Sequence, residues 1–80
     1  MNSFACSKFY RVIGDELRIA RSKKGLSQME LFLETNISRE TISRIECGSR
    51  RISVHHLYIL CDYLDIPIEK LLKKGISNDN

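Results

Sequence analysis

Apolar residues recur at helical spacing from the first third of the chain onwards. In the first predicted helix, residues 8–24, the apolar positions are Phe9, Ile13, Leu17 and Ala20. Residues three or four positions apart lie on one face of an α-helix, so these side chains are expected to face a core. Runs that alternate between apolar and polar residues, as β-strands do, are few. The pattern therefore predicts an all-α fold.

Four further helices are marked by residues that commonly begin or end helices. Ser27 and Glu30 form a capping-box sequence, in which both side chains satisfy free N–H groups of the first turn. Later serines at N-cap positions and Gly48 at a helix end set the next boundaries, and Pro67 suits a first helical turn. The predicted helices cover residues 28–34, 38–46, 53–64 and 68–74.

The two central helices are joined by a short turn, Thr35-Asn36-Ile37. Asparagine tolerates the left-handed backbone conformation better than most residues, which suits a tight turn. Two short helices connected in this way are typical of a helix-turn-helix motif. In that motif the first helix lies across the DNA backbone, and the second offers its N-terminal residues to base edges in the major groove.

Composition limits the classes of protein to which the chain can belong. Its 80 residues, 42% of them hydrophobic, suffice for a single domain over residues 1–80, with an N-terminal extension (1–7) and a flexible tail (75–80). The formal net charge of +3 is mildly basic and does not by itself indicate nucleic acid. Three cysteines without a Cys-x-x-Cys pair argue against a disulfide framework or a zinc site and favour the reducing cytoplasm. No apolar segment reaches the length of a membrane span.

Many residues between positions 13 and 72 match one known family in a gap-free register. They are Ile13, Gly14, Leu17, Arg18, Arg21, Lys24, Gly25, Leu26, Ser27, Gln28, Glu30, Leu31, Ile37, Ser38, Arg39, Thr41, Ile42, Ser43, Arg44, Ile45, Glu46, Gly48, Ser53, Leu57, Leu60, Leu64, Leu71 and Leu72. In these residues the chain resembles the phage lambda repressor/Cro-like helix-turn-helix family, also called XRE-like. The resemblance implies a five-helix DNA-binding domain with a central helix-turn-helix.

The resemblance places the readers of DNA bases in the first turns of the helix at 38–46. The candidates are Arg39, Glu40, Ser43 and Arg44. Arg39 can donate two hydrogen bonds to guanine O6 and N7, while Glu40 accepts one from cytosine N4 or orients Arg39. In the alternative interpretation the arginines are ordinary solvated side chains, and Glu40 pairs with Arg44 one helical turn later.

A second group of residues is expected to hold the DNA backbone. It consists of Gln28, Ser38, Thr41, Ser49, Arg50 and Arg51. Gln28 resembles the glutamine that holds a phosphate at the start of the family's second helix, where free backbone N–H groups attract anions. Arg50 and Arg51 resemble a basic loop that grips the flanking backbone. Their alternative role is that of a solvated loop.

Two further features of the resemblance concern stability. Arg21 and Glu46 resemble a buried ion pair that ties the first helix to the third in this family. Phe32 stands where the family usually has a small residue, because the helices at 28–34 and 38–46 cross closely there. We expect Phe32 to fill the volume that Ala20 leaves, since the family often has leucine at that position.

Apolar residues away from the inner face of the helix at 53–64 suggest a dimer face. The candidates are Tyr58, Ile59, Tyr63, Ile68 and Leu72. An exposed apolar patch on a small regulator favours a homodimer with twofold symmetry, which would also match paired half-sites on DNA. Alternatively, these residues cover the N-terminal extension, which contributes its own phenylalanines, Phe4 and Phe9.

No residue pattern indicates an enzyme, a cofactor or a metal. His55 and His56 are adjacent and therefore do not share a helical face. Cys47 directly follows the predicted helix at 38–46, near Arg44 and Arg50, and is interpreted as a plain surface cysteine, with redox sensing as the alternative. The chain shows no nucleophile–histidine arrangement and no glycine-rich phosphate loop.

The sequence thus predicts a cytoplasmic transcriptional regulator that binds a palindromic double-stranded DNA operator as a homodimer. Among short members of the family, the resemblance is to restriction–modification controller proteins or phage-type repressors. The alternative is a protein-interaction module, such as an antitoxin-like domain that binds a partner protein, because a helix-turn-helix fold does not guarantee DNA binding.

Overall fold

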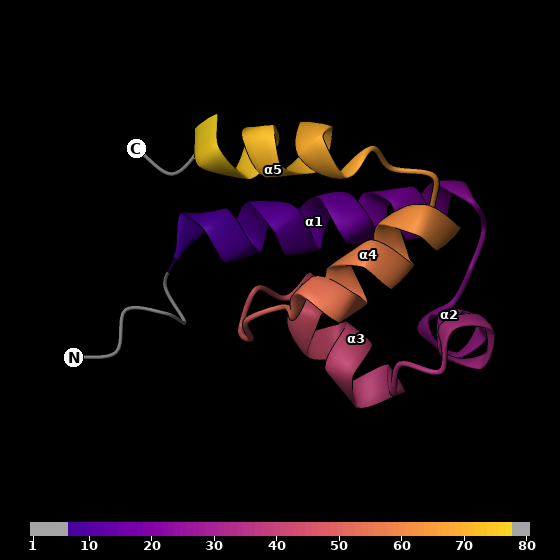
Figure 1. The fold of residues 1–80 in the computed structure, drawn as a ribbon. Helices are drawn as coiled ribbons and strands as arrows, with labels where there is room; N and C mark the ends of the chain where they lie inside the picture. Colours follow the sequence, from indigo (N-terminus) through magenta and orange to yellow (C-terminus); the bar gives the residue numbers. More distant parts are fainter. Residues whose placement is uncertain (1–6, 78–80) are drawn as a thin grey trace.

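The computed structural model describes residues 7–77, which form five α-helices and no strand (Figure 1). The helices are α1 (Lys8–Lys23), α2 (Gln28–Thr35), α3 (Arg39–Glu46), α4 (Val54–Tyr63) and α5 (Ile68–Ser77). The predicted all-α, five-helix fold is therefore confirmed, including the short central pair α2 and α3. Within residues 7–77, no helix is long and apolar enough to cross a membrane.

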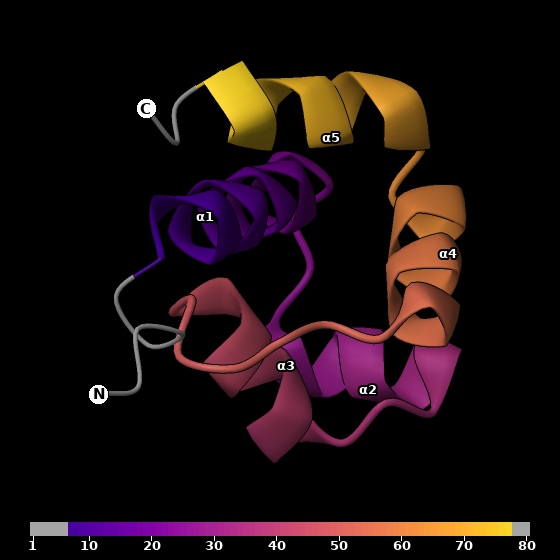
Figure 2. The ribbon, with the colours of Figure 1, turned by 60° about the vertical axis from the view of Figure 1, so that its left-hand side comes forward.

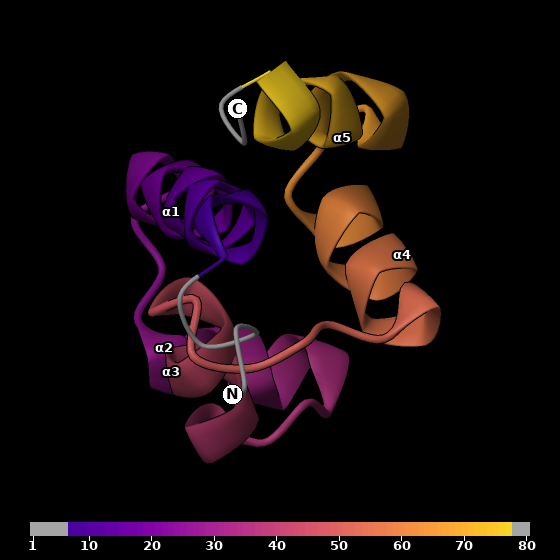
Figure 3. The ribbon, with the colours of Figure 1, turned by 90° about the vertical axis from the view of Figure 1, so that its left-hand side faces the viewer.

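The long helix α1 lies at the centre of the arrangement. It packs against α5 on one side and α3 on the other, so it separates the two (Figure 2). Helix α4 contacts both α2 and α5, and the helices surround a single core (Figure 3). The fully buried apolar residues come from all five helices and two loops: Ile13, Leu17, Leu31, Ile37, Ile42, Ile45, Leu60, Cys61, Leu64 and Leu71.

The capping residues act as their sequence positions indicate. Ser27 Oγ accepts a hydrogen bond from the backbone N–H of Glu30 at 3.0 Å, and Glu30 Oε1 accepts one from the Ser27 N–H at 2.8 Å. At the starts of α3 and α4, Ser38 Oγ and Ser53 Oγ accept from the backbone N–H groups of Thr41 and His56, without a reciprocal bond. Ser7 occupies the N-cap position of α1 without a side-chain capping bond. The bonds at Ser27, Ser38 and Ser53 fix where three loops become helices.

The predicted end of the last helix at residue 74 is wrong, because α5 continues through Ser77. Gly75 was expected to begin a flexible tail, yet it is buried against α1. A β-carbon at this position would lie 2.8 Å from Cδ1 of Phe9 and 3.0 Å from Cδ1 of Ile13. The contact with α1 stabilises a helical turn that local propensity disfavours. Residues 1–6 and 78–80, which include Phe4 and Cys6, lie outside the described residues.

Phe32 is half-buried and packs against the core, as does Ala20. Both side chains therefore belong to the same cluster, which is compatible with the compensation expected between them. Whether Phe32 fills that volume stays a prediction.

Candidate nucleic-acid interface

A turn in the left-handed conformation sets the direction of α3 relative to α2. Asn36 has φ 61°, and its N–H donates to the Phe32 carbonyl at 2.7 Å. Thr35 Oγ1 donates to the Leu31 carbonyl at 2.7 Å and accepts from the Ile37 N–H at 3.3 Å. The side chain of Ile37 is buried, so the turn is anchored in the core. Thr35 and Asn36 thus form a closed turn.

Helix α3 has one buried face and one exposed polar face. Ile42 and Ile45 are only 1% and 2% exposed and hold the helix against the core. The opposite side lines a shallow depression of ≈ 500 Å³, together with the start of α2. Its lining residues are Gln28, Arg39, Glu40, Ser43 and Arg44. The structure therefore brings the four predicted base readers and Gln28 together on one surface.

Within residues 7–77, one of the two arginines on this surface is paired with a carboxylate and the other is not. Arg44 Nη2 donates to Glu40 Oε2 at 2.9 Å, and both side chains are mostly exposed. This is the pairing that the alternative interpretation describes. Such exposed pairs contribute about 0.3–0.5 kcal/mol, so DNA could readily displace it. Arg39 is exposed and forms no ion pair with any residue between 7 and 77, which leaves its guanidinium available to a partner.

A buried ion pair ties α1 to α3 beneath the surface, as the family resemblance implied. Arg21 donates from Nε to Glu46 Oε2 at 2.7 Å and from Nη2 to Oε1 at 3.0 Å. A third bond runs from Arg21 Nη1 to the Leu26 carbonyl at 2.6 Å. The side chains of Arg21 and Glu46 are 13% and 5% exposed. Such a two-pronged pair fixes orientation as well as distance.

Gln28 joins this network at the first position of α2. Its Nε2 donates to Glu46 Oε1 at 3.0 Å. The amide is therefore held in place by the Arg21–Glu46 pair, at a helix N-terminus and beside the depression. A side chain that is already oriented loses little conformational entropy on binding an anion. The predicted phosphate contact by Gln28 remains a prediction.

The other predicted backbone contacts lie at the two ends of α3. Ser38 Oγ accepts from the Thr41 N–H at 3.1 Å and donates to Thr41 Oγ1 at 2.8 Å, so both residues take part in the cap. After the helix, Ser49 Oγ donates to the Arg44 carbonyl at 3.3 Å. Arg50 and Arg51 follow on an exposed loop.

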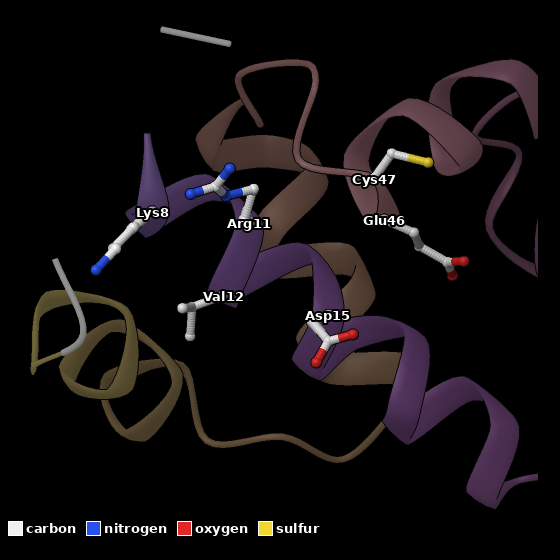
Figure 4. A pocket seen from close by; sticks show the side chains of 6 residues that line it. All are labelled: Lys8, Arg11, Val12, Asp15, Glu46 and Cys47. Atoms are coloured by element: carbon white, nitrogen blue, oxygen red, sulfur yellow. The ribbon is translucent and has the colours of Figure 1, made fainter. Parts of the chain in front are cut away.

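A second depression, of ≈ 400 Å³, lies where α1 meets the end of α3 (Figure 4). It is lined by Lys8, Arg11, Val12, Asp15, Glu46 and Cys47. Sequence reasoning did not single out Lys8 and Arg11, whose only signal is their spacing of one helical turn. Cys47 is exposed and free, and Cys61 is free and buried.

Two titratable groups near the core have altered pKa values. Burial lowers the pKa of His56 below its ordinary 6.5, and the nearby His55 and Arg50 lower it further. Burial also raises the pKa of the Cys61 thiol. Within residues 7–77, no group of three or more His, Cys, Asp or Glu side chains is placed to hold a metal ion.

The residues predicted at a dimer face differ in how far their side chains are exposed to solvent. Tyr58 is 59% exposed on α4. Ile59, Tyr63 and Ile68 are half-buried and pack against the core, and Leu72 is also half-buried. The exposed apolar surface is therefore narrower than predicted.

Comparison with known proteins identifies the family. A model of the helix-turn-helix family matches residues 17–71, which include the C-terminal part of α1, all of α2, α3 and α4, and the start of α5. The chain belongs to the helix-turn-helix family. No curated protein sequence matches the chain.

Several solved structures of regulators share this helix-turn-helix fold. The restriction–modification controller protein C.AhdI from Aeromonas hydrophila is 32% identical, with a TM-score of 0.71 over 78% of this chain and 94% of that chain. The DNA-binding domain of BldD from S. venezulae is 26% identical, with a TM-score of 0.73 over 82% and 99%. The clp gene regulator ClgR from C. glutamicum is 24% identical, with a TM-score of 0.76 over 90% and 94%, and shows the fold alone.

Proposed function

We propose that this helix-turn-helix protein is a sequence-specific transcriptional regulator that binds a palindromic DNA operator as a homodimer. The observation that carries the proposal is the exposed surface where Arg39, Glu40, Ser43 and Arg44 meet Gln28. Four hydrogen-bonding side chains on one face of the second helix of the motif suit the major groove. The likeness to C.AhdI supports a controller protein as the subclass, and a phage-type repressor is the other candidate.

Each side chain on this surface has a role that follows from its chemistry. Arg39 reads guanine through two parallel donors, because its guanidinium is not engaged by the described residues. Glu40 accepts from cytosine when it releases Arg44, which then reaches a base or a phosphate. Gln28 binds a phosphate at the start of α2, where the free N–H groups and the helix dipole attract anions. The arginines at 50 and 51 and the hydroxyls of residues 38, 41 and 49 add backbone contacts.

Dimerisation is proposed through the outer face of α4 and the adjoining edge of α5. Val54 is 83% exposed and Tyr58 59% exposed, one turn apart on α4. A depression of ≈ 260 Å³ between these helices offers a further apolar surface. Its lining residues are Tyr58, Cys61, Asp62, Ile66 and Ile68. A twofold dimer would present two α3 helices to half-sites about 34 Å apart.

Dependence on salt distinguishes this proposal from a protein-interaction module. Fluorescence-anisotropy titrations of duplex DNA between about 50 and 200 mM salt should show affinity falling steeply, since each phosphate contact releases a counterion. Arg39→Ala should lose part of its preference for the operator over a scrambled duplex, whereas Lys70→Ala, on α5, should retain the full preference. Salt-insensitive or absent binding by the folded protein would favour the interaction module instead.

Sedimentation tests the dimer separately. Tyr58→Asp should shift the protein from dimer to monomer, because a charge would be desolvated in an apolar interface. Leu33→Asp is the matched control, since Leu33 is 71% exposed on α2 and belongs to neither α4 nor α5. A wild-type protein that remains monomeric at operator-binding concentrations would contradict the dimer.

A further inference from the structure

The first turns of α1 lie beside the C-terminal end of α3 and the loop that follows it. Gly48, with φ 72°, passes so close to α1 that a β-carbon would lie 2.6 Å from Cγ and 2.7 Å from Cα of Arg11. This contact fixes the basic loop against α1. It also places Lys8 and Arg11 at the depression that Cys47 shares (Figure 4).

Lys8 and Arg11 are the two charged residues lining this depression that form no ion pair with a described residue, so their cationic groups can bind an anion. Both side chains are exposed, and neither forms an ion pair with any residue from 7 to 77. The two acidic residues nearby are already neutralised. Asp15 accepts from Arg18 Nη2 at 2.6 Å, and Glu46 is held by Arg21. The depression therefore presents an uncompensated positive charge to solvent.

This depression continues the proposed DNA-reading surface. Glu40, Arg44 and Cys47 follow one another at spacings of four and three residues, so they lie along one stripe of α3. Glu40 and Arg44 line the depression that also contains Arg39. Cys47, at the other end of the stripe, lines the depression that contains Lys8 and Arg11. A DNA backbone that leaves the reading surface at the C-terminal end of α3 would pass these two cations.

We propose that Lys8 and Arg11 form a second phosphate-binding site, which holds DNA backbone flanking the base pairs that α3 reads. The inference rests on the proposed DNA binding and extends it. The site lies on a part of α1 that precedes the family match at residue 17. It adds affinity and a longer footprint without adding base specificity, because phosphate contacts position a protein but do not read sequence.

The test is the salt dependence of operator binding in a paired variant, Lys8→Gln with Arg11→Gln. Glutamine keeps much of the side-chain stem, including the part of Arg11 that contacts Gly48. Each lost phosphate contact lowers the slope of log K against log salt by about 0.9, so the slope should fall by roughly two. The pair Lys70→Gln with Lys73→Gln removes equal charge from α5, on the far side of α1 from α3, and should leave the slope much nearer to the wild-type value.

A footprint provides the second measurement. Hydroxyl-radical protection should shorten at the flanking edge of the site in the Lys8/Arg11 variant, while the preferred base sequence stays the same. Arg11→Lys should retain most of the wild-type slope. An unchanged slope and footprint in a variant with the wild-type urea midpoint would overturn the site. Absence of salt-dependent binding by the wild type would instead overturn the proposed function.

Discussion

Removal of the Glu46 carboxylate should strongly destabilise the fold. Glu46→Ala deletes both hydrogen bonds that hold the Arg21 guanidinium and the one from Gln28, leaving Arg21 only its bond to the Leu26 carbonyl. The Arg21 side chain is 13% exposed, so its charge would remain largely buried and uncompensated. Breaking such a pair from one side costs about 3–5 kcal/mol.

The expected loss is a large part of the total stability. A domain of 80 residues has a free energy of unfolding of about 4–12 kcal/mol. Urea denaturation followed by circular dichroism measures the change. With a slope near 1 kcal/mol per molar urea, the midpoint should fall by roughly 3 M or more, or the variant should be unfolded in buffer.

Two controls separate the lost charge partner from other effects. Arg18→Ala removes an exposed ion pair with Asp15 on the same helix and should leave the midpoint unchanged within error. The double variant Arg21→Met with Glu46→Leu should recover much of the loss, because it leaves no charge buried. A Glu46→Ala midpoint equal to that of the wild type would refute the reasoning.

Three further changes test other parts of the structure. Phe32→Ala should lower the free energy of unfolding by about 3 kcal/mol and the melting temperature by roughly 10 °C or more, because it opens a cavity beside the core. Gly14→Ala should destabilise by about 1–3 kcal/mol despite the higher helix propensity of alanine, since a β-carbon would overlap backbone carbonyls of α3. The lowered pKa of His56 means that the unfolded chain takes up a proton more readily below pH 6.5. The stability of the wild type relative to His56→Gln should therefore fall as the pH drops from 6.5 through the lower folded pKa, and then level off.

Each of these has a simple control. Leu33→Ala, at an exposed neighbour of Phe32, should barely change the melting temperature; an equal or raised melting temperature in Phe32→Ala would contradict the cavity. Ser22→Ala, at an exposed position of α1, should be neutral or slightly stabilising, and a similar result for Gly14→Ala would contradict the backbone contact. For His56, a difference between wild type and variant that stays constant from pH 7.5 to pH 5 would contradict the pKa shift.

Local sequence signals predicted much of the fold because they act over few residues. The capping box at Ser27 and the serine cap at Ser38 need only the bonds within one turn. The left-handed turn at Asn36 likewise follows from the intrinsic tolerance of one residue. These elements were confirmed, as was the Arg21–Glu46 pair that the family resemblance implied.

Features set by contacts between distant segments could not be predicted in this way. Gly75 continues α5 where Phe9 and Ile13 of α1 lie against it, and this contact joins segments more than 60 residues apart. The place of Lys8 and Arg11 beside the end of α3 depends on the approach of Gly48 to α1, which no local pattern encodes. Likewise, the choice of Glu40 between Arg39 and Arg44 depends on the side-chain conformations of the folded protein.

The most direct test of the account is a selection of binding sites from randomised duplex DNA, carried out with the wild type and with Arg39→Ala. The account predicts that the wild type enriches a palindromic motif with two half-sites. The variant should retain the motif but lose preference at one base position in each half-site, because one guanine reader is gone. If folded wild-type protein enriches no motif, α3 does not read DNA, and the central claim is contradicted.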